Sequence, residues 1–281
     1  MKFGINTFVW VSPFKTEVAE ELADKVKKIG FDIIELSCEQ PSLIDVSKVN
    51  TIIKEKGLDV VVCGAFGLSR NLCGEDPQLV QNAKEYIYWL IDAAAVLGAK
   101  VVAGPMYSSV GKAHYDDLVE REKEWDRAVD NMRQMADYAA SKDVRLALET
   151  LNRFETDMIN TVSQGLEFIK DIGRENVGLH LDTFHMHLEE KSSADAIRLA
   201  GDKIFHFHAC ENDRGIPGSG QVHWDEVFKA LKEIEYPGPI VIESFSQDVK
   251  EIARAVCIWR EIAPSQDAIA VDGLNFLKES Y

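Results

Sequence analysis

The feature that most constrains the fold is an alternation, along the whole chain, of short apolar runs with longer amphipathic segments. The apolar runs have the length of buried strands, and the segments between them show the three- and four-residue apolar spacing of helices. The pattern predicts strands at 3–10, 31–36, 58–65, 99–104, 144–149, 177–182, 204–208 and 239–243. It predicts helices at 17–29, 46–56, 78–97, 122–141, 162–172, 193–200, 224–234 and 249–262.

This alternation predicts a parallel sheet, because each helix carries the chain back to the start of the next strand. Eight units of about 35 residues fit an α/β fold of the closed (β/α)8 TIM-barrel type. We expect a single domain over residues 1–281, with a C-terminal appendage from about residue 264. A doubly wound open sheet is the alternative. It is disfavoured because Asn6-Thr7-Phe8-Val9-Trp10 stands where such a sheet carries a glycine-rich phosphate loop.

Four successive predicted strands end on a residue that can bind a metal ion: Glu149, Asp182, His208 and Glu243. A single acid at a strand end is more often a helix cap or an ion-pair partner, and a single core histidine is usually just hydrogen-bonded. In a barrel, however, the carboxyl ends of all strands meet at one end, where the active sites of this fold lie. We therefore expect the four residues to form one site.

Three carboxylates and one imidazole form a hard, mainly oxygen ligand set. Such a set suits Mn²⁺, Co²⁺ or Mg²⁺ better than a thiolate-binding metal, so we expect one divalent ion. His206 and His208 lie two residues apart on a strand and should face the same way. His208 is nearer the strand end and is the predicted ligand, whereas His206 is predicted to lie in the inner layer behind it. His180 has the same spacing to Asp182 and is predicted to be structural.

Charge and cysteine content restrict the partners and the compartment. The chain has 31 basic and 47 acidic residues, a net charge of −16, which disfavours duplex nucleic acid and anionic membranes as partners. The five cysteines are scattered without a C-x-x-C pair, as is typical of reduced thiols. No secretory leader precedes Phe3 and no apolar run approaches the length of a membrane span. We expect a cytoplasmic protein with a small-molecule partner.

Four motifs resemble those of the ketose 3-epimerases, the D-tagatose 3-epimerase and D-psicose (allulose) 3-epimerase type of xylose isomerase-like TIM barrel. Residues 149–155 resemble the E-x-x-N-R-F-E of that family, and residues 181–186 are similar to its L-D-T-F-H-M. Residues 206–220 resemble H-F-H-x-x-E-x-x-R-x-x-P-G-x-G, and Val241-Ile242-Glu243 parallels the segment with the final acid. The first half of the chain matches mainly in layout.

The resemblance implies that Glu149, Asp182, His208 and Glu243 bind one divalent ion, commonly Mn²⁺ or Co²⁺. It also implies that Glu149 and Glu243 act as the acid and the base. Relatives commonly form dimers or tetramers, so the resemblance implies a homo-oligomer as well.

The resemblance further implies that Glu155, His185 and Arg214 hold the sugar. The chain departs from the pattern at Asn6, where relatives acting on D-psicose carry an aromatic residue, and in the loop of Met106 and Tyr107. Both positions would border the far end of the sugar, so the preferred ketose stays open.

The chemistry of C3 inversion favours two groups on opposite faces of the ketose, because one group tends to return a proton to the face that lost it. Predicted strands five and eight lie three of eight steps apart, about 135° around the barrel, which places Glu149 and Glu243 on opposite flanks. An ion between them would hold O2 and O3, polarise the carbonyl and stabilise a cis-enediolate. The predicted substrate is a free ketose of the D-tagatose, D-fructose/D-psicose or L-ribulose type.

Other functions suit the same barrel. An aldose–ketose or hydroxypyruvate-type isomerase, or an inosose dehydratase, is the main alternative. A DNA-repair endonuclease needs more histidine ligands, and the net charge opposes DNA. A sugar-binding barrel without catalysis is disfavoured because both candidate bases are present. A phosphorylated sugar is disfavoured because Arg214 is the only well-placed cation and no glycine-rich phosphate cradle is evident.

Overall fold

The structure is a computed structural model that describes residues 1–114 and 118–281. Its eight strands are β1 Phe3–Asn6, β2 Ile33–Ser37, β3 Asp59–Cys63, β4 Val101–Gly104, β5 Arg145–Glu149, β6 Val177–Asp182, β7 Ile204–Ala209 and β8 Ile240–Ile242. They pair in parallel in chain order, and β8 pairs with β1 to close the barrel. The predicted TIM barrel is therefore confirmed, and the open doubly wound sheet is ruled out.

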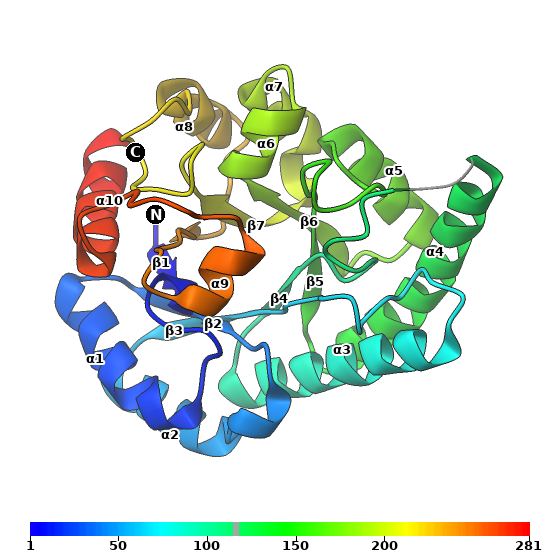
Figure 1. Cartoon of the computed structure of the whole chain (residues 1–281), viewed down its shortest axis with the longest axis horizontal. Helices are drawn as coiled ribbons and strands as arrows, with labels where there is room; N and C mark the ends of the chain where they lie inside the picture. The colour runs from blue at the N-terminus through cyan, green and yellow to red at the C-terminus, as the bar shows by residue number, and fades with distance from the viewer. Residues whose placement is uncertain (115–117) are drawn as a thin grey trace.

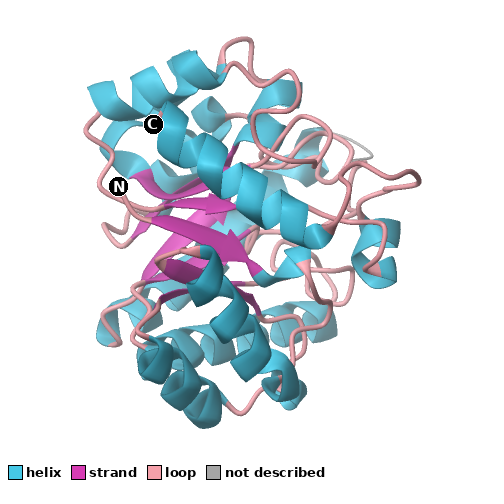
Figure 2. Cartoon of the chain, turned by 90° about the vertical axis from the view of Figure 1, so that its left-hand side faces the viewer, coloured by secondary structure: helices cyan, strands magenta, loops and turns pink. Residues whose placement is uncertain are grey.

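Helices surround the strands on all sides (Figures 1 and 2). They are α1 Ala19–Ile29, α2 Val46–Lys56, α3 Pro77–Leu97, α4 Leu118–Ser141, α5 Val162–Ile172, α6 Thr183–Glu189, α7 Ser193–Ala200, α8 Trp224–Glu233, α9 Lys250–Ala255 and α10 Gln266–Ser280. Short 3₁₀ turns occur at η1 Thr7–Val9, η2 Thr16–Val18, η3 Pro41–Leu43 and η4 Gly201–Lys203. Most strand residues are apolar, because one face packs on these helices and the other fills the barrel.

Local sequence signals set many of these boundaries. The helices α1 and α2 end at Gly30 and Gly57, whose φ angles of +103° and +61° favour glycine. The α2 helix begins after Asp45, whose carboxylate accepts a hydrogen bond from the Lys48 backbone N–H. These ends agree with the predicted ones because backbone preference and the apolar pattern point the same way.

The first strand is shorter than predicted. The Asn6 side chain accepts a hydrogen bond from the Phe8 backbone N–H at 2.8 Å and thereby starts the η1 turn. The extended run expected over residues 3–10 consequently ends at Asn6, and residues 7–9 form the η1 turn.

The C-terminal part of the chain also differs from the expectation. The last predicted helix, 249–262, is reduced to the short α9, while the stretch expected as an appendage forms the 15-residue α10. Ser265 caps α10 by accepting from the Ala268 N–H, and the helix buries Ile269, Leu274 and Leu277 against the barrel core. The α10 helix contacts β1, β8 and α8, so it completes the outer layer where the two ends of the chain meet (Figure 1).

An irregularity between β6 and β7 orients the histidines of β7. Leu179 lies opposite Ile204, but the next residue, His180, lies opposite His206, so β7 advances two residues while β6 advances one. Gly178 makes room for the extra residue, because a Cβ there would lie 2.6 Å from the Phe205 ring. The offset places His206 beside His180 inside the barrel.

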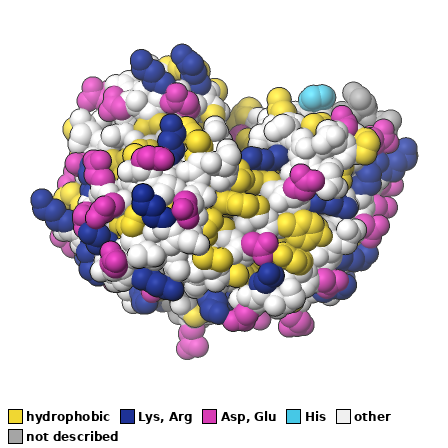
Figure 3. Space-filling model, turned by 90° about the horizontal axis from the view of Figure 1, so that it is seen from below, with side chains coloured by type: hydrophobic (Ala, Val, Ile, Leu, Met, Phe, Trp, Pro, Cys, Tyr) yellow, Lys and Arg dark blue, Asp and Glu magenta, His cyan; other side chains and the backbone are white. Residues whose placement is uncertain are grey.

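The surface that carries α1 to α3 mixes charges of both signs. Basic and acidic side chains are interspersed there around smaller groups of apolar side chains (Figure 3). Within residues 1–114 and 118–281, none of the helices combines the length and apolarity needed to cross a membrane.

Candidate active site

The four predicted metal ligands lie together at the carboxyl end of the barrel. Glu149, Asp182, His208 and Glu243 each offer one ligand atom, and these atoms all lie within 4.8 Å of one another. The Nδ1 atom of His208 lies 3.8 Å from Asp182 Oδ2 and 3.6 Å from Glu243 Oε2. All four side chains are buried. One expectation needs correction: His208 is the second-last residue of β7 and Glu243 follows β8, so only Glu149 and Asp182 end their strands.

The donor set is compatible with a divalent cation. Burial raises the pKa of the Glu149 carboxyl well above its usual range, and the charges of Glu243 and Asp182 raise it further against the opposing influence of His208 and Arg214. Three carboxylates confined to one buried space repel each other, and a cation among them removes that repulsion. Oxygen atoms and one imidazole nitrogen are also the donors that hard divalent ions prefer.

Asp182 has a second role at the start of α6. Its Oδ1 atom accepts a hydrogen bond from the Phe184 N–H at 2.7 Å, which makes it the cap of this seven-residue helix. The same helix carries His185, so the strand that ends on one candidate ligand also positions a second polar group of the site. This helix was not among the predicted ones.

His185 faces Glu149 with a defined tautomer. The Asn152 backbone N–H donates to His185 Nδ1 at 3.1 Å, so the ring proton resides on Nε2. Burial, with the nearby charge of Arg214, lowers the pKa of His185 to about 3, so the ring is neutral at neutral pH. Its Nε2 atom lies 3.6 Å from Glu149 Oε1. His185 can therefore present a hydrogen-bond donor to a ligand in the site.

Arg214 enters the site from the loop after β7. Its Nη1 atom lies 3.2 Å from both Asp182 Oδ2 and Glu243 Oε2, and its guanidinium stacks on the Phe184 ring at 3.8 Å. Its Nη2 atom lies 3.9 Å from Glu155 Oε1, so the structure brings all three predicted sugar-binding residues to the mouth of the carboxylate cluster. The backbone of Arg214 has a φ of +67°, a conformation that is rare for a residue with a side chain.

Glu211 holds the loop of Arg214 in place. This buried carboxylate accepts hydrogen bonds from the backbone N–H groups of Asn212, Gly218 and Val222 and from Trp224 Nε1, all between 2.9 and 3.0 Å. Four donors fully use the acceptor capacity of a carboxylate. The unusual backbone of Arg214 is thus maintained by the loop around it. Glu211 belongs to the motif at residues 206–220, but no local sequence signal indicates this role.

Asn6 and Tyr107, which were expected to border the far end of the sugar, are both buried. The Tyr107 hydroxyl is buried and donates to the backbone carbonyl of Glu149 at 2.8 Å, so it supports β5 from behind. Asn6 is fully buried in β1, and its Nδ2 donates to Glu35 Oε1 at 2.6 Å. Asn6 therefore reaches the site through Glu35.

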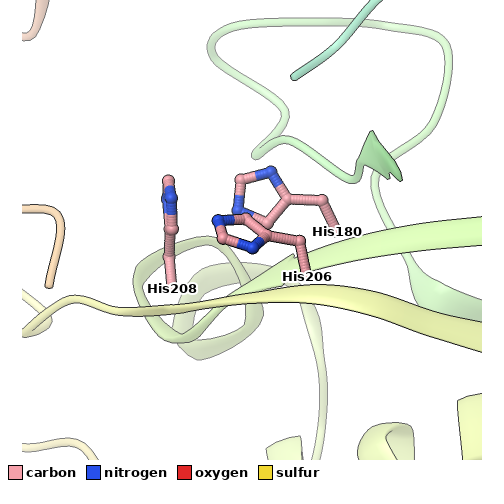
Figure 4. A group of neighbouring side chains, drawn as sticks. All are labelled: His180, His206 and His208. Carbon is pink, nitrogen blue, oxygen red and sulfur yellow. The ribbon is translucent and has the colours of Figure 1, made fainter. Parts of the chain in front are cut away.

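Glu35 is the residue of this region that the sequence analysis missed. It lies in β2 inside the barrel, and its Oε1 and Oε2 atoms lie 2.7 Å and 2.5 Å from the Nε2 atoms of His208 and His206. Burial alone would raise the pKa of the Glu35 carboxyl, but the two histidines hold it well below its usual range. His180 completes the group, with its ring centroid 4.1 Å from that of His208 (Figure 4).

Known proteins resemble this chain over its full length. The family model described as xylose isomerase-like TIM barrel matches residues 23–280. The L-ribulose 3-epimerase of Methylomonas sp. (strain DH-1) is 32% identical over 100% of this chain and 98% of its own length. The D-psicose 3-epimerase of Enterocloster bolteae is 34% identical over 97% of this chain and 91% of its own length. The chain belongs to the ketose 3-epimerase family of xylose isomerase-like TIM barrels.

Solved structures agree with this assignment. The D-allulose 3-epimerase from Methylomonas sp. in complex with D-allulose superposes with a TM-score of 0.93 at 32% identity, covering 100% of this chain and 97% of that protein. The D-psicose 3-epimerase from Clostridium cellulolyticum H10 with D-tagatose gives a TM-score of 0.89 at 30% identity, covering 100% and 99%. The chain is accordingly an isomerase of the carbohydrate epimerase class, as the motifs of its second half predicted.

Proposed function

We propose that this protein is a metal-dependent ketose 3-epimerase that inverts C3 of a free ketose. The observation that carries the proposal is the convergence of Glu149 and Glu243, from β5 and β8, on one buried cluster with Asp182 and His208. Inversion needs a group that removes a proton from one face of C3 and a group that supplies a proton to the other face. Two carboxyl groups from separate strands suit these roles.

The remaining polar groups are proposed to hold the sugar. The Nε2–H group of His185 and the guanidinium of Arg214 offer donors to sugar oxygens, and the Glu155 carboxylate offers an acceptor for a hydroxyl. A cavity of about 330 Å³ lies beside Arg214 and Phe184, with residues 256–260 on its other wall. The cavity adjoins Arg214, but none of Glu149, Asp182 and Glu243 lines it, so it lies beside the carboxylate cluster.

We propose Mn²⁺ as the ion, with Co²⁺ or Mg²⁺ as alternatives, held by Glu149, Asp182, His208 and Glu243. Such an ion polarises the ketose carbonyl and stabilises the negative charge that develops when the C3 proton leaves. Arg214 is the one cation in contact with the cluster among the described residues, which supports a sugar without a phosphate group.

The names of the relatives supply candidates for the substrate. L-ribulose, D-psicose (D-allulose), D-tagatose and D-fructose are ketoses that share the arrangement of C2 carbonyl and C3 hydroxyl on which the proposed chemistry acts. We propose that one of these is the substrate.

The decisive experiment is proton NMR of each ketose incubated with the Mn²⁺-loaded protein in D₂O. The 3-epimer should appear with deuterium at C3. An aldose product with deuterium only at C1 would contradict the proposal and favour an aldose–ketose isomerase, and a dehydrated product would favour a dehydratase. Fructose phosphates, tested alongside D-fructose, should react more slowly than the free sugar.

We also expect a homo-oligomer, a dimer or a tetramer, in the cytoplasm. Light scattering coupled to size-exclusion chromatography measures the subunit count directly, and a mass of 31.5 kDa, that of one chain, would contradict the expectation.

A further inference from the structure

The interior of the barrel below the carboxylate cluster holds a polar group that the proposed reaction does not use. Glu35, His180 and His206 are all buried, with 0% exposure. Neither ring nitrogen of His180 has a hydrogen-bond partner among the residues that the structure describes. Buried polar groups of this kind destabilise a fold relative to apolar packing, so their presence calls for a role.

Hydrogen bonding defines which groups donate to Glu35. The Phe8 backbone N–H donates to Asn6 Oδ1, so the Asn6 amide must turn its Nδ2 donor toward Glu35 Oε1. The same oxygen lies 2.7 Å from His208 Nε2 in a hydrogen bond. The other carboxylate oxygen lies 2.5 Å from His206 Nε2, a close contact without hydrogen-bond geometry. A carboxylate only accepts hydrogen bonds, so His208 carries a proton on Nε2.

The consequence for His208 lies on the opposite side of its ring. With the proton on Nε2, the Nδ1 atom has a free lone pair, and this atom points at Asp182 Oδ2 and Glu243 Oε2 at 3.8 and 3.6 Å. Only this tautomer allows His208 to act as a ligand from that side. Metal-binding histidines are generally held in this way, by a carboxylate on the nitrogen that does not face the ion.

We infer that Glu35 is a positioning residue that, through a hydrogen bond to Nε2, fixes His208 with Nδ1 toward the ion shared with Glu149, Asp182 and Glu243. His206 Nε2 contacts the other oxygen of the same carboxylate. The His180 ring packs against both histidines (Figure 4). This inference rests on the proposed metal site. It assigns to β2, which contributes no ligand, control over the affinity of that site.

The test compares Glu35→Gln with Ser37→Ala. Glutamine has the shape of glutamate, but it replaces the charged carboxylate that accepts from His208 Nε2 with a neutral amide, whose oxygen is the weaker acceptor and whose nitrogen cannot accept. Ser37 lies two residues further on the same strand and face, and its hydroxyl donates to Asn6 Oδ1 without touching a histidine. Removing it is therefore a matched loss of one buried hydrogen bond.

Isothermal titration calorimetry of the metal-depleted proteins with MnCl₂ gives the readout. Glu35→Gln should weaken Mn²⁺ binding about 10- to 100-fold, the usual effect of removing such a partner, while Ser37→Ala should bind as wild type does. Equal affinity of Glu35→Gln and wild type would overturn the inference. If wild type itself binds no Mn²⁺, the proposed metal site fails instead, so the two failures are distinguishable.

A second measurement needs no variant at Glu35. Long-range ¹⁵N–¹H NMR of the Mg²⁺-loaded, ¹⁵N-histidine-labelled wild-type protein reports the tautomer of each ring, with a His208→Gln variant for assignment. His208 should be in the Nε2–H form. An Nδ1–H form, or rapid exchange between the two, would overturn the inference even if Glu35→Gln fails to fold.

Discussion

The two halves of the barrel differ in the chemistry of their strand ends. In the second half, β5 to β8 bring Glu149, Asp182, His208 and Glu243 to one cluster. In the first half, β1 to β4 end on Asn6, Ser37, Cys63 and Gly104, none of which is charged. Strands β1 to β4 place one acid, Glu35, near the cluster. It lies two residues before the end of β2 and contacts His206 and His208 of the second half. Under the proposed function, one half holds the reacting groups and the other half orients them.

Removal of the metal should give the largest effect, because every proposed ligand lies in the second half. Dialysis against a chelator should abolish epimerisation, and Mn²⁺ should restore it. Mn²⁺ should also raise the melting temperature of wild type, since an ion at a thousand times its Kd adds about 4 kcal/mol to the free energy of unfolding. Asp182→Asn should lose this thermal shift while Ser37→Ala keeps it, as measured by scanning calorimetry. Equal shifts of the melting temperature in both variants would contradict the proposed difference between the two halves of the barrel.

Glu243→Gln and Cys63→Ser compare the residue that follows β8 with the last residue of β3. Glu243→Gln removes a proton-transfer group and should lower kcat about 10²- to 10⁴-fold, whereas Cys63→Ser should leave kcat close to that of wild type. Steady-state kinetics measure both. Sugar binding that survives in Glu243→Gln, seen by calorimetry, would identify an enzyme rather than a binding protein. A kcat of Glu243→Gln equal to that of wild type would remove Glu243 from the proposed acid–base pair.

Arg214→Lys tests substrate binding rather than chemistry. Lysine keeps the charge but cannot stack a planar group on Phe184 while reaching both Asp182 and Glu243. We expect KM to rise about 10- to 100-fold, in line with about 1.5–3 kcal/mol for a hydrogen bond to a charged group, with a smaller change in kcat. Arg260→Lys, an exposed change beside the same cavity, is the control. A change in kcat alone would assign Arg214 to the chemical step.

Arg153→Ala should give the smallest effect, although Arg153 lies within a motif of the second half. Burial alone raises the pKa of Glu189, but hydrogen bonds from the Arg153 side chain and backbone lower it below its usual 4.5. The pair therefore stabilises the fold above pH 4.5, and this contribution disappears as the pH falls through the lower folded pKa. The loss at pH 7 should be less than about 1 kcal/mol, as is usual for exposed ion pairs.

Urea unfolding of wild type and Arg153→Ala at pH 7 and at pH 3 measures this difference. The gap between the two proteins should shrink at pH 3. A gap that widens there would show that the pair has another role.

The fold and the four candidate ligands were predictable because the signals are local. Each of Glu149, Asp182 and Glu243 closes an apolar run, and the geometry of a barrel brings such ends together wherever they fall in the chain. The helix α10 was not predicted as part of the barrel because a polar stretch separates it from the last strand, and only the packed structure shows which face it covers.

The roles of Glu35 and Glu211 could not be predicted from the sequence for a different reason. Glu35 lies within the apolar run from Ile33 to Leu36. Its partners Asn6, His206 and His208 are 29 and more than 170 residues away in the sequence. An acid in such a run is readable as buried, but no local pattern names its partners. Glu211 lies in a loop rich in glycine and proline, and its role depends on the three-dimensional path of that loop.

The extra residue in β7 limits how this enzyme can change. Removal of the extra residue, Phe205, would let Ile204 and His206 pair as consecutive residues with Leu179 and His180, so the histidines would keep their faces, but the Phe205 ring opposite Gly178 would be lost from the barrel. Because side chains alternate along a strand, a residue inserted between His206 and His208 would instead turn His208 away from the cluster. Substitutions in this segment can alter affinity by degrees, whereas such an insertion would abolish the site in one step. Libraries built to shift sugar preference should therefore keep the length of β7 constant and vary its neighbours.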